Sequence, residues 1–359
     1  MTAAFRICSA LAVAFVIAVA ACSTTGSELH IANTCAAGAR VHDEYRINVD
    51  GARLYLLVRG PTCDAPLLLW LHGGPGAAER PLFRLYNSGL EDDFLVAYLD
   101  QRGAGRSWDP DADPETLTIH RHLADVEQVV AALNGTYPGR PVLLVGHSWG
   151  AALGILFSAT YPSDIAAVIA VNPLIDLQAS QAAQSVFVAE QARRHGHTSI
   201  LTQVQEIGAP PFSGSEALAL QALVGSYGGE FHNRPSFLGA TLNGLFRGFE
   251  SPAGIVRIIR ANQASLDAMA DDLAELNLRQ SVQRLNVPLV LMLGRYDHIL
   301  PPSLAEAFAA EIEVPSGRII WFEDSAHNIP FEQPDAFVDA VARFARELGI
   351  AGQISEGSR

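Results

Sequence analysis

The chain has 359 residues, 49% of them hydrophobic and 17% charged, which suits one large α/β domain, or a domain with an insert, and excludes a disordered chain. Its formal net charge of −14 gives no electrostatic basis for binding nucleic acid. Lysine and arginine together number 24, and every one of them is arginine. The lack of lysine excludes Schiff-base and pyridoxal phosphate chemistry and the phosphate-binding P-loop.

The N-terminal segment has the pattern of an export signal. Arg6 precedes an apolar run over 7–21, which suits a secretory signal and is too short for a typical membrane-spanning helix. The run ends in VAACS, which resembles a bacterial lipobox and would make Cys22 the acylated first residue of the mature protein. We therefore expect a signal peptide over 1–21 and a lipidated tether over 22–40 that anchors the protein to a membrane of the bacterial cell envelope, the outer membrane where one exists. An ordinary export signal followed by a chance cysteine is the alternative.

The cysteine count fits an exported protein. Cys8 would leave with the signal and Cys22 would carry the lipid, so that Cys35 and Cys63 remain. Two cysteines in an exported protein favour a disulfide. The bridge would close a loop of about 29 residues and contribute about 3–4 kcal/mol on the chain-entropy model. Two unpaired thiols are the alternative.

The chain then alternates between strand and helix patterns. Two strand-like stretches, 44–49 and 53–58, flank an Asp-Gly pair that is typical of a β-hairpin. Continuous apolar runs, typical of buried parallel strands, follow at 66–71, 94–99, 141–145, 166–171, 288–293 and 318–322. Helical patterns occur at 119–133, 151–160, 303–311 and 334–348. This alternation predicts an α/β fold with a doubly wound, mostly parallel sheet.

One connection has no buried strand run. The segment 177–285 is rich in alanine, glutamine and leucine and is broken by glycine and proline, which predicts a helical insertion over the end of the sheet. We call it the helical insertion. The predicted core is then made of 41–176 and 286–350, and a short tail follows at 351–359.

The most specific motif is GHSWG at 146–150. It follows an apolar strand and precedes a helix, which is the context of the G-x-S-x-G nucleophile elbow. The glycines let the turn close and present the Ser148 hydroxyl at the carboxyl edge of the sheet. A packing turn without chemistry is the alternative reading of such a motif.

A serine nucleophile needs a base and an orienting acid. The expected chain order is serine, acid, histidine, with both partners in loops after later strands. Asp297 and His327 occupy these positions. Asp176 and Asp324 are alternative acids, and His298 is the rival base.

The tetrahedral intermediate also needs hydrogen-bond donors for its oxyanion. The backbone N–H of Trp149, directly after the nucleophile, is the first candidate. The second comes from HGGPG at 72–76, where Gly74 is preferred and Gly73 is the alternative. We expect His72 to pack within this loop or hydrogen-bond to it and to take no part in catalysis.

These motifs together carry a resemblance to a known family. HGGPG, DQRGAGRS at 100–107, GHSWG, GRYD at 294–297 and SAH at 325–327 resemble the proline iminopeptidase branch of the α/β-hydrolase superfamily, over roughly 40–176 and 286–348. The resemblance implies a serine hydrolase that needs no cofactor and no metal, with Ser148, Asp297 and His327 as the triad. It also implies a helical cap that shapes substrate choice, and a loop-holding role for Asp100 and Arg102.

The resemblance makes release of an N-terminal residue from short peptides the leading expectation within a wider class of small amide and ester substrates. Cap carboxylates of that branch bind the substrate's amino group. The helical insertion offers Glu190, Glu206, Glu216, Glu230 and Glu250, none of them in a matching motif. Carboxylesterase or lipase-like activity therefore stays open, as does a catalytically idle binding lipoprotein of the envelope. The two histidines of RRHGH at 193–197 indicate a solvated loop and not a metal pair.

Overall fold

The computed structural model describes residues 38–212, 214–233 and 250–350. These ranges contain one eight-stranded sheet of order β1-β2-β4-β3-β5-β6-β7-β8. β1 pairs with β2, and β2 with β4, in antiparallel register, and the remaining neighbours are parallel. The predicted α/β fold with a mostly parallel sheet is confirmed. The strands are β1 (Val41–Val49), β2 (Ala52–Gly60), β3 (Leu67–Leu71), β4 (Leu95–Asp100), β5 (Val142–His147), β6 (Ile165–Val171), β7 (Leu289–Gly294) and β8 (Gly317–Phe322).

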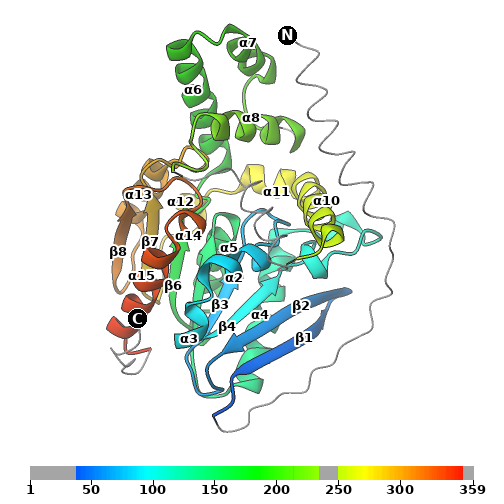
Figure 1. The fold of residues 1–359 in the computed structure, drawn as a ribbon, viewed down its shortest axis with the longest axis vertical. Coiled ribbons are helices and arrows are strands. Elements are labelled where there is room, and N and C mark those ends of the chain that lie inside the picture. The colour runs from blue at the N-terminus through cyan, green and yellow to red at the C-terminus, as the bar shows by residue number, and fades with distance from the viewer. Residues whose placement is uncertain (1–37, 213, 234–249, 351–359) are drawn as a thin grey trace.

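Helices cover both faces of the sheet (Figure 1). One face carries α4 (Ile119–Thr136), α5 (Trp149–Thr160) and α13 (Pro302–Glu311). The other carries α2 (Arg80–Asn87), α3 (Leu90–Asp93), α14 (Ile329–Glu332) and α15 (Pro334–Glu347). Short 3₁₀ turns lie at Gly105–Ser107, Pro114–Thr116 and Pro162–Asp164.

The central strands are apolar throughout because both of their faces are covered. In β3, Leu67 and Leu69 pack into the cluster beneath α4 and α5, whereas Leu68 and Trp70 pack into the cluster beneath α2 and α15. The two buried clusters together fix the register of the sheet. The carboxyl ends of β3, β5, β6, β7 and β8 therefore meet at one edge.

The predicted hairpin has the geometry that its sequence favours. Asp50 and Gly51 both have positive φ, 42° and 78°, between β1 and β2. Two such residues form the primed turn whose twist matches that of the flanking strands.

The helical insertion follows β6 and leads into β7. In the part that the structure describes, it holds α6 (Leu177–His195), α7 (Thr198–Ile207), α8 (Gly214–Ser226), α10 (Pro252–Ala268), α11 (Ala270–Glu275) and α12 (Leu278–Ser281), with no strand. Figure 1 shows α6, α7 and α8 projecting beyond the edge of the sheet, with α10 and α11 over it. The prediction of a loop for the RRHGH stretch is wrong: Arg193, Arg194 and His195 form the last turn of α6, and Gly196 is its left-handed cap. The stretch is nevertheless exposed.

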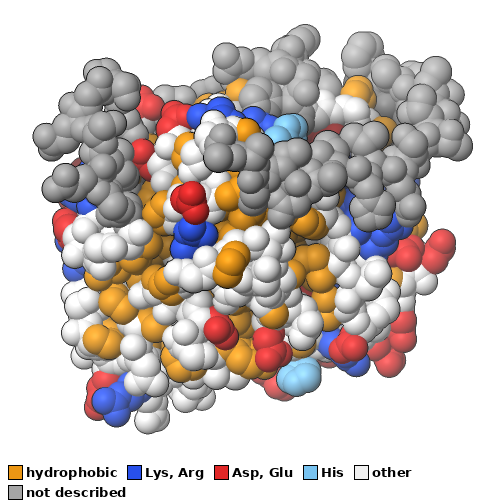
Figure 2. Space-filling view, turned by 90° about the horizontal axis from the view of Figure 1, so that it is seen from below, with side chains coloured by type: hydrophobic (Ala, Val, Ile, Leu, Met, Phe, Trp, Pro, Cys, Tyr) orange, Lys and Arg blue, Asp and Glu red, His pale blue; other side chains and the backbone are white. Residues whose placement is uncertain are grey.

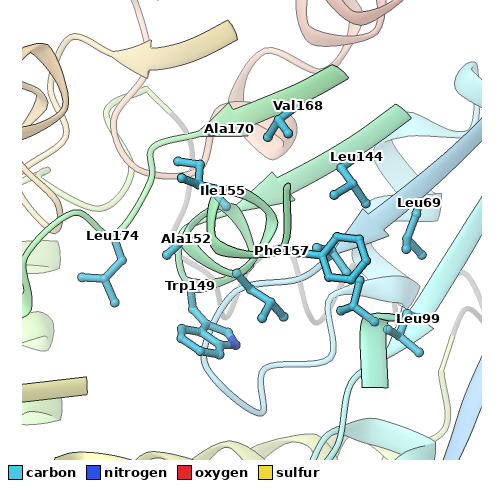
Figure 3. Packing of buried hydrophobic residues seen from close by; sticks show 14 of the residues in the cluster. Leu69, Leu99, Leu144, Trp149, Ala152, Ile155, Phe157, Val168, Ala170 and Leu174 are labelled. Atoms are coloured by element: carbon cyan, nitrogen blue, oxygen red, sulfur yellow. The ribbon is translucent and has the colours of Figure 1, made fainter. Parts of the chain in front are cut away.

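Helix α5 is buried along most of its length. Figure 3 shows Phe157 of this helix near Leu69 and Leu144 of the strands, and Trp149 and Ile155 on other sides of the same helix. Each of these side chains is at most 1% exposed. The helix that begins at the nucleophile motif is thus fixed on the sheet.

The molecular surface opposite α6–α8 is mixed in character. Figure 2 shows acidic and basic side chains interspersed there with small apolar areas. Within the described ranges, no helix has both the length and the hydropathy to cross a bilayer. The predicted signal peptide, the tether with Cys22, and the tail at 351–359 lie outside the described residues, or almost wholly so. Cys63 is disulfide-bonded, and its expected partner, Cys35, also lies outside them, so the pairing remains a prediction.

Candidate active site

Ser148 forms a tight turn between β5 and α5. Its φ of 57° and ψ of −117° are unusual for a residue with a side chain, and its N–H donates to the Val171 carbonyl at 2.9 Å. The flanking glycines make this turn possible. A Cβ on Gly146 would lie 2.3 Å from the Gly150 carbonyl oxygen, and one on Gly150 would lie 2.1 Å from that of Leu71. Strain at a fixed turn on the carboxyl edge is typical of a functional residue.

Asp297 and His327 are brought together at the same edge. The His327 Nδ1 donates to Asp297 Oδ2 at 2.8 Å, and Asp297 is 1% exposed. The other oxygen, Oδ1, accepts the N–H groups of Ile299 and Leu300, both at 2.8 Å. The carboxylate is therefore fixed, and it orients the imidazole so that Nε2 is the ring nitrogen left to accept a proton.

The alternative acids and the rival base lie in other environments. Asp176 caps α6, accepting from the N–H of Ala179 at 2.9 Å, and its second oxygen accepts from Asn277. Asp324 is exposed. The His298 ring stacks on Phe187 with centroids 3.8 Å apart, and burial lowers its pKa.

The HGGPG loop lies against the Ser148 turn. A Cβ built on Gly73 would be 3.3 Å from Ser148 Cβ, and Gly74 borders the same cavity as Ser148. Trp149 is the first residue of α5, where a backbone N–H has no partner within the helix. Both predicted oxyanion donors are thus near Ser148.

The loop itself is fixed by a buried hydrogen-bond network. His72 Nε2 accepts from the Gln101 N–H at 3.1 Å, and its Nδ1 donates to the Gly73 carbonyl at 2.8 Å. Burial lowers the pKa of His72, in keeping with this neutral ring. Gln101 also donates to the His72 carbonyl and accepts from the Trp149 indole N–H. The network links β3, β4 and α5 beneath the candidate oxyanion site.

Asp100 and Arg102 also hold loops. Arg102 makes two bonds to Asp125, at 2.7 and 2.8 Å, and a third to the Val49 carbonyl. Asp100 accepts from Arg80 and from the Arg106 N–H. Both are almost fully buried and do not border the cavity at Ser148.

A cavity of about 730 Å³, open to solvent, lies beside Ser148. It is bounded by Leu174, the loop after β7 and the helical insertion. Its lining is mostly aliphatic, with one phenylalanine (Phe212) and three glutamines (Gln181, Gln184 and Gln221), and no charged residue is among the described residues that form it. The space beside Ser148 is thus uncharged and mostly apolar.

Two buried polar residues were not predicted from the sequence. Glu79 bonds to His147, and Asn172 bonds to the His327 carbonyl. Asn172 directly follows an apolar strand, which is the signal that could have drawn attention to it, whereas Glu79 lies in a stretch that gives no such signal. Glu230 was one of the candidate glutamates, and its carbonyl accepts the His327 N–H at 3.2 Å.

The model of the α/β hydrolase fold family matches residues 66–334. The chain belongs to the α/β-hydrolase fold family. In this fold the carboxyl edge of the sheet carries the nucleophile turn, in agreement with the position of Ser148 here. No group of three or more potential metal ligands occurs in the described part of this α/β hydrolase.

Proteins similar to this α/β hydrolase in sequence or in fold carry peptidase and esterase names. It is 29% identical over 304 residues to the probable aminopeptidase YbaC of Bacillus subtilis, covering 84% of this chain and 95% of that protein. Its fold is similar to that of the proline iminopeptidase of Mycobacterium smegmatis, with a TM-score of 0.64, 18% identity and coverage of 85% and 98%. The esterase of Exiguobacterium antarcticum gives a TM-score of 0.59, 18% identity and coverage of 83% and 97%.

Proposed function

We propose that this α/β hydrolase is a serine hydrolase that cleaves small amide or ester substrates through an acyl-enzyme, with release of an N-terminal residue as its leading activity. The observation that carries the proposal is the fixed Asp297–His327 pair at the edge where Ser148 is held in a strained turn. The aminopeptidase name of the B. subtilis relative supports the substrate class.

The proposed reaction has two halves. Ser148 Oγ attacks the substrate carbonyl while His327 Nε2 takes the hydroxyl proton and Asp297 stabilises the resulting imidazolium. The N–H groups of Trp149 and Gly74 stabilise the oxyanion. His327 then returns the proton to the leaving amine or alcohol as the carbonyl–nitrogen or carbonyl–oxygen bond breaks. Water, deprotonated by the same imidazole, hydrolyses the acyl-enzyme and restores Ser148.

An aminopeptidase also needs a group that binds the substrate's ammonium. Among the five candidate glutamates named above, Glu230 is supported best, because its backbone bonds to His327 and the charge of that ring acts on its carboxylate. Burial raises the pKa of Glu230, and the charges of Glu332 and Asp297 add to this although His327 opposes it. A bound ammonium would relieve this unfavourable burial of negative charge. Glu250, by contrast, lies 3.7 Å from Arg80.

The test is a substrate panel on the wild type and Ser148→Ala. Prolyl, alanyl and leucyl arylamides should be cleaved by the wild type, and Ser148→Ala should lose at least about 10⁴-fold in kcat together with all labelling by a fluorophosphonate probe. Retained labelling in that variant would show that Ser148 is not the nucleophile. A wild type that cleaves neither arylamides nor p-nitrophenyl esters would contradict the proposed function.

Esterase activity is the second candidate, and the uncharged cavity favours it. An apolar acyl chain needs no ionic partner, whereas an ammonium in the aliphatic part of this cavity would be costly. The same panel decides: short acyl esters cleaved at least tenfold faster than every aminoacyl arylamide, by kcat/KM, would make this protein an esterase.

We also propose that the protein is anchored to the cell envelope through a lipid on Cys22, on the basis of the lipobox-like VAACS sequence. A lipid with two or more chains holds a protein stably on a membrane. The full-length wild type should fractionate with membranes and Cys22→Ser should be released or left unprocessed. Equal fractionation of the wild type and a Cys22→Ser protein that has lost residues 1–21 would overturn the anchor.

A further inference from the structure

A second carboxylate–histidine pair lies directly behind the nucleophile turn. His147 is the last residue of β5, next to Ser148, and Glu79 directly precedes α2. His147 Nδ1 lies 2.7 Å from Glu79 Oε1, and the two side chains are 3% and 7% exposed. His147 Nε2 lies 2.9 Å from the main-chain oxygen of His327. One ring thus bridges a buried acid and the backbone of the proposed base.

The hydrogen-bond partners of His147 show which of its ring nitrogens carry a hydrogen. A carbonyl oxygen only accepts, so Nε2 must carry a hydrogen and donate it to His327. A second hydrogen lies between Nδ1 and Glu79. Burial alone would lower the pKa of His147, but the charge and hydrogen bond of Glu79, with the His327 carbonyl and the charge of Asp297, outweigh burial and raise that pKa. The ring therefore has a bond on each nitrogen, one to Glu79 and one to the main chain of His327.

Asn172 donates to the same carbonyl. It directly follows β6, and its Nδ2 lies 2.8 Å from the His327 oxygen and 3.0 Å from that of Ala326. Its Oδ1 accepts the Gly294 N–H at 2.9 Å. The main chain at His327 is thus held by donors from the ends of β5 and β6, while Asp297 holds the ring from the loop after β7. The His147 and His327 rings are also in contact, with centroids 4.8 Å apart.

We propose that His147, oriented by Glu79, is a positioning residue for His327: it fixes the main chain of the base so that the imidazole stays aligned with Ser148. Neither His147 nor Glu79 lines the cavity, and their bonds lead to the main chain of His327. The inference rests on the proposed function, because it gives His327 the role of base. A displacement of about 1 Å in a catalytic group can cost about 100-fold in rate.

Two substitutions of His147 separate its two contacts. In His147→Gln the side-chain amide can reach the position of Nε2 and keep a donor for the His327 carbonyl. In His147→Asn the shorter amide reaches only the position of Nδ1, so that it keeps the hydrogen bond to Glu79 and loses the one to the His327 carbonyl. We expect kcat to fall about 30- to 100-fold in His147→Asn with KM within about twofold, and to stay within about fivefold of the wild type in His147→Gln. The rate of fluorophosphonate labelling should fall in parallel with kcat.

The thermal midpoint of each variant controls for a general packing defect. Equal kcat losses in the two variants would overturn the positioning role. So would losses that scale with the drop in thermal midpoint and not with loss of the donor to the His327 carbonyl. Ser148→Ala, assayed alongside, keeps the two proposals distinguishable. An inactive wild type contradicts the proposed function, whereas an active wild type with equal His147 variants contradicts only the role of His147.

Discussion

The two regions that border Ser148, the sheet edge and the helical insertion, differ in the chemical character of their side chains. At the sheet edge, polar groups are bonded to one another: Asp297 accepts three hydrogen bonds, and the His327 carbonyl accepts two. The wall formed by the helical insertion is aliphatic, with neutral glutamines. The hydrogen bonds at the edge therefore permit one geometry of the polar groups, whereas the wall limits the size and polarity of a substrate in the cavity. A substitution at the edge should change the rate for every substrate, and one in the wall should change the preference among substrates.

The strongest test of this contrast is Asp297→Asn. The amide fits the same space but stabilises the wrong imidazole tautomer, so kcat should fall about 10⁴-fold on amides and esters alike. Steady-state kinetics on one substrate of each class measure the effect. A loss of kcat on only amides or only esters would show that Asp297 contributes to specificity, and that the sheet edge does not act equally on every substrate.

The neutral wall predicts a second large effect, in substrate choice. Leucyl arylamide should exceed glutamyl and arginyl arylamides by about 100-fold or more in kcat/KM, because the cavity offers a charged side chain no partner for its lost hydration. Competition between paired substrates measures the ratio directly. Comparable rates for the three would mean that the substrate side chain binds elsewhere.

Glu230 belongs to the helical insertion and bonds through its backbone to His327 at the sheet edge. Removing its carboxylate should show whether that group serves substrate binding or the support of His327. Glu230→Gln should raise KM for aminoacyl arylamides about tenfold through loss of the charge that binds the ammonium. Hydrolysis of p-nitrophenyl acetate, which has no ammonium, should be unchanged. Glu216→Gln, in the same helical insertion but exposed, is the matched control. An equal loss on both substrates would assign Glu230 to the support of His327 alone.

The smallest expected effect is a pH dependence of stability from the Glu79–His147 pair. Because the pKa of His147 is raised in the folded protein, its contribution is complete below about pH 6.5, its ordinary value, and is lost as the pH rises through the higher folded value. The free energy of unfolding, from urea titrations between pH 6 and 9, should therefore fall more steeply in the wild type than in Glu79→Gln. Parallel curves would show that the pair does not share a proton.

Much of the sheet could be predicted because its strands are buried on both faces. The apolar run 94–99, for example, corresponds to β4 at Leu95–Asp100. Helix α5 begins two residues earlier than expected, at Trp149, because the strained turn at Ser148 leads directly into the helix. Helix α2 was not predicted: it has only two turns and follows a stretch of glycine and proline, which is too little for a periodic pattern.

The proposed reacting residues could be located because each follows a strand in a recognisable motif, whereas the residues that support them could not. Glu79 follows two alanines and precedes an arginine, a context typical of a solvated side chain. It is buried only because His147, 68 positions away, binds it. The fold creates such pairs, and one sequence carries no local signal of them.

The loop at 227–233 of the helical insertion has a further consequence. The Glu230 carbonyl accepts the His327 N–H, the His232 N–H binds Glu332, and the His232 ring stacks on Tyr296. This loop and the main chain of the proposed base are thus bonded to each other. A substitution that displaces the loop should therefore also displace His327 and lower the rate without any contact with the substrate.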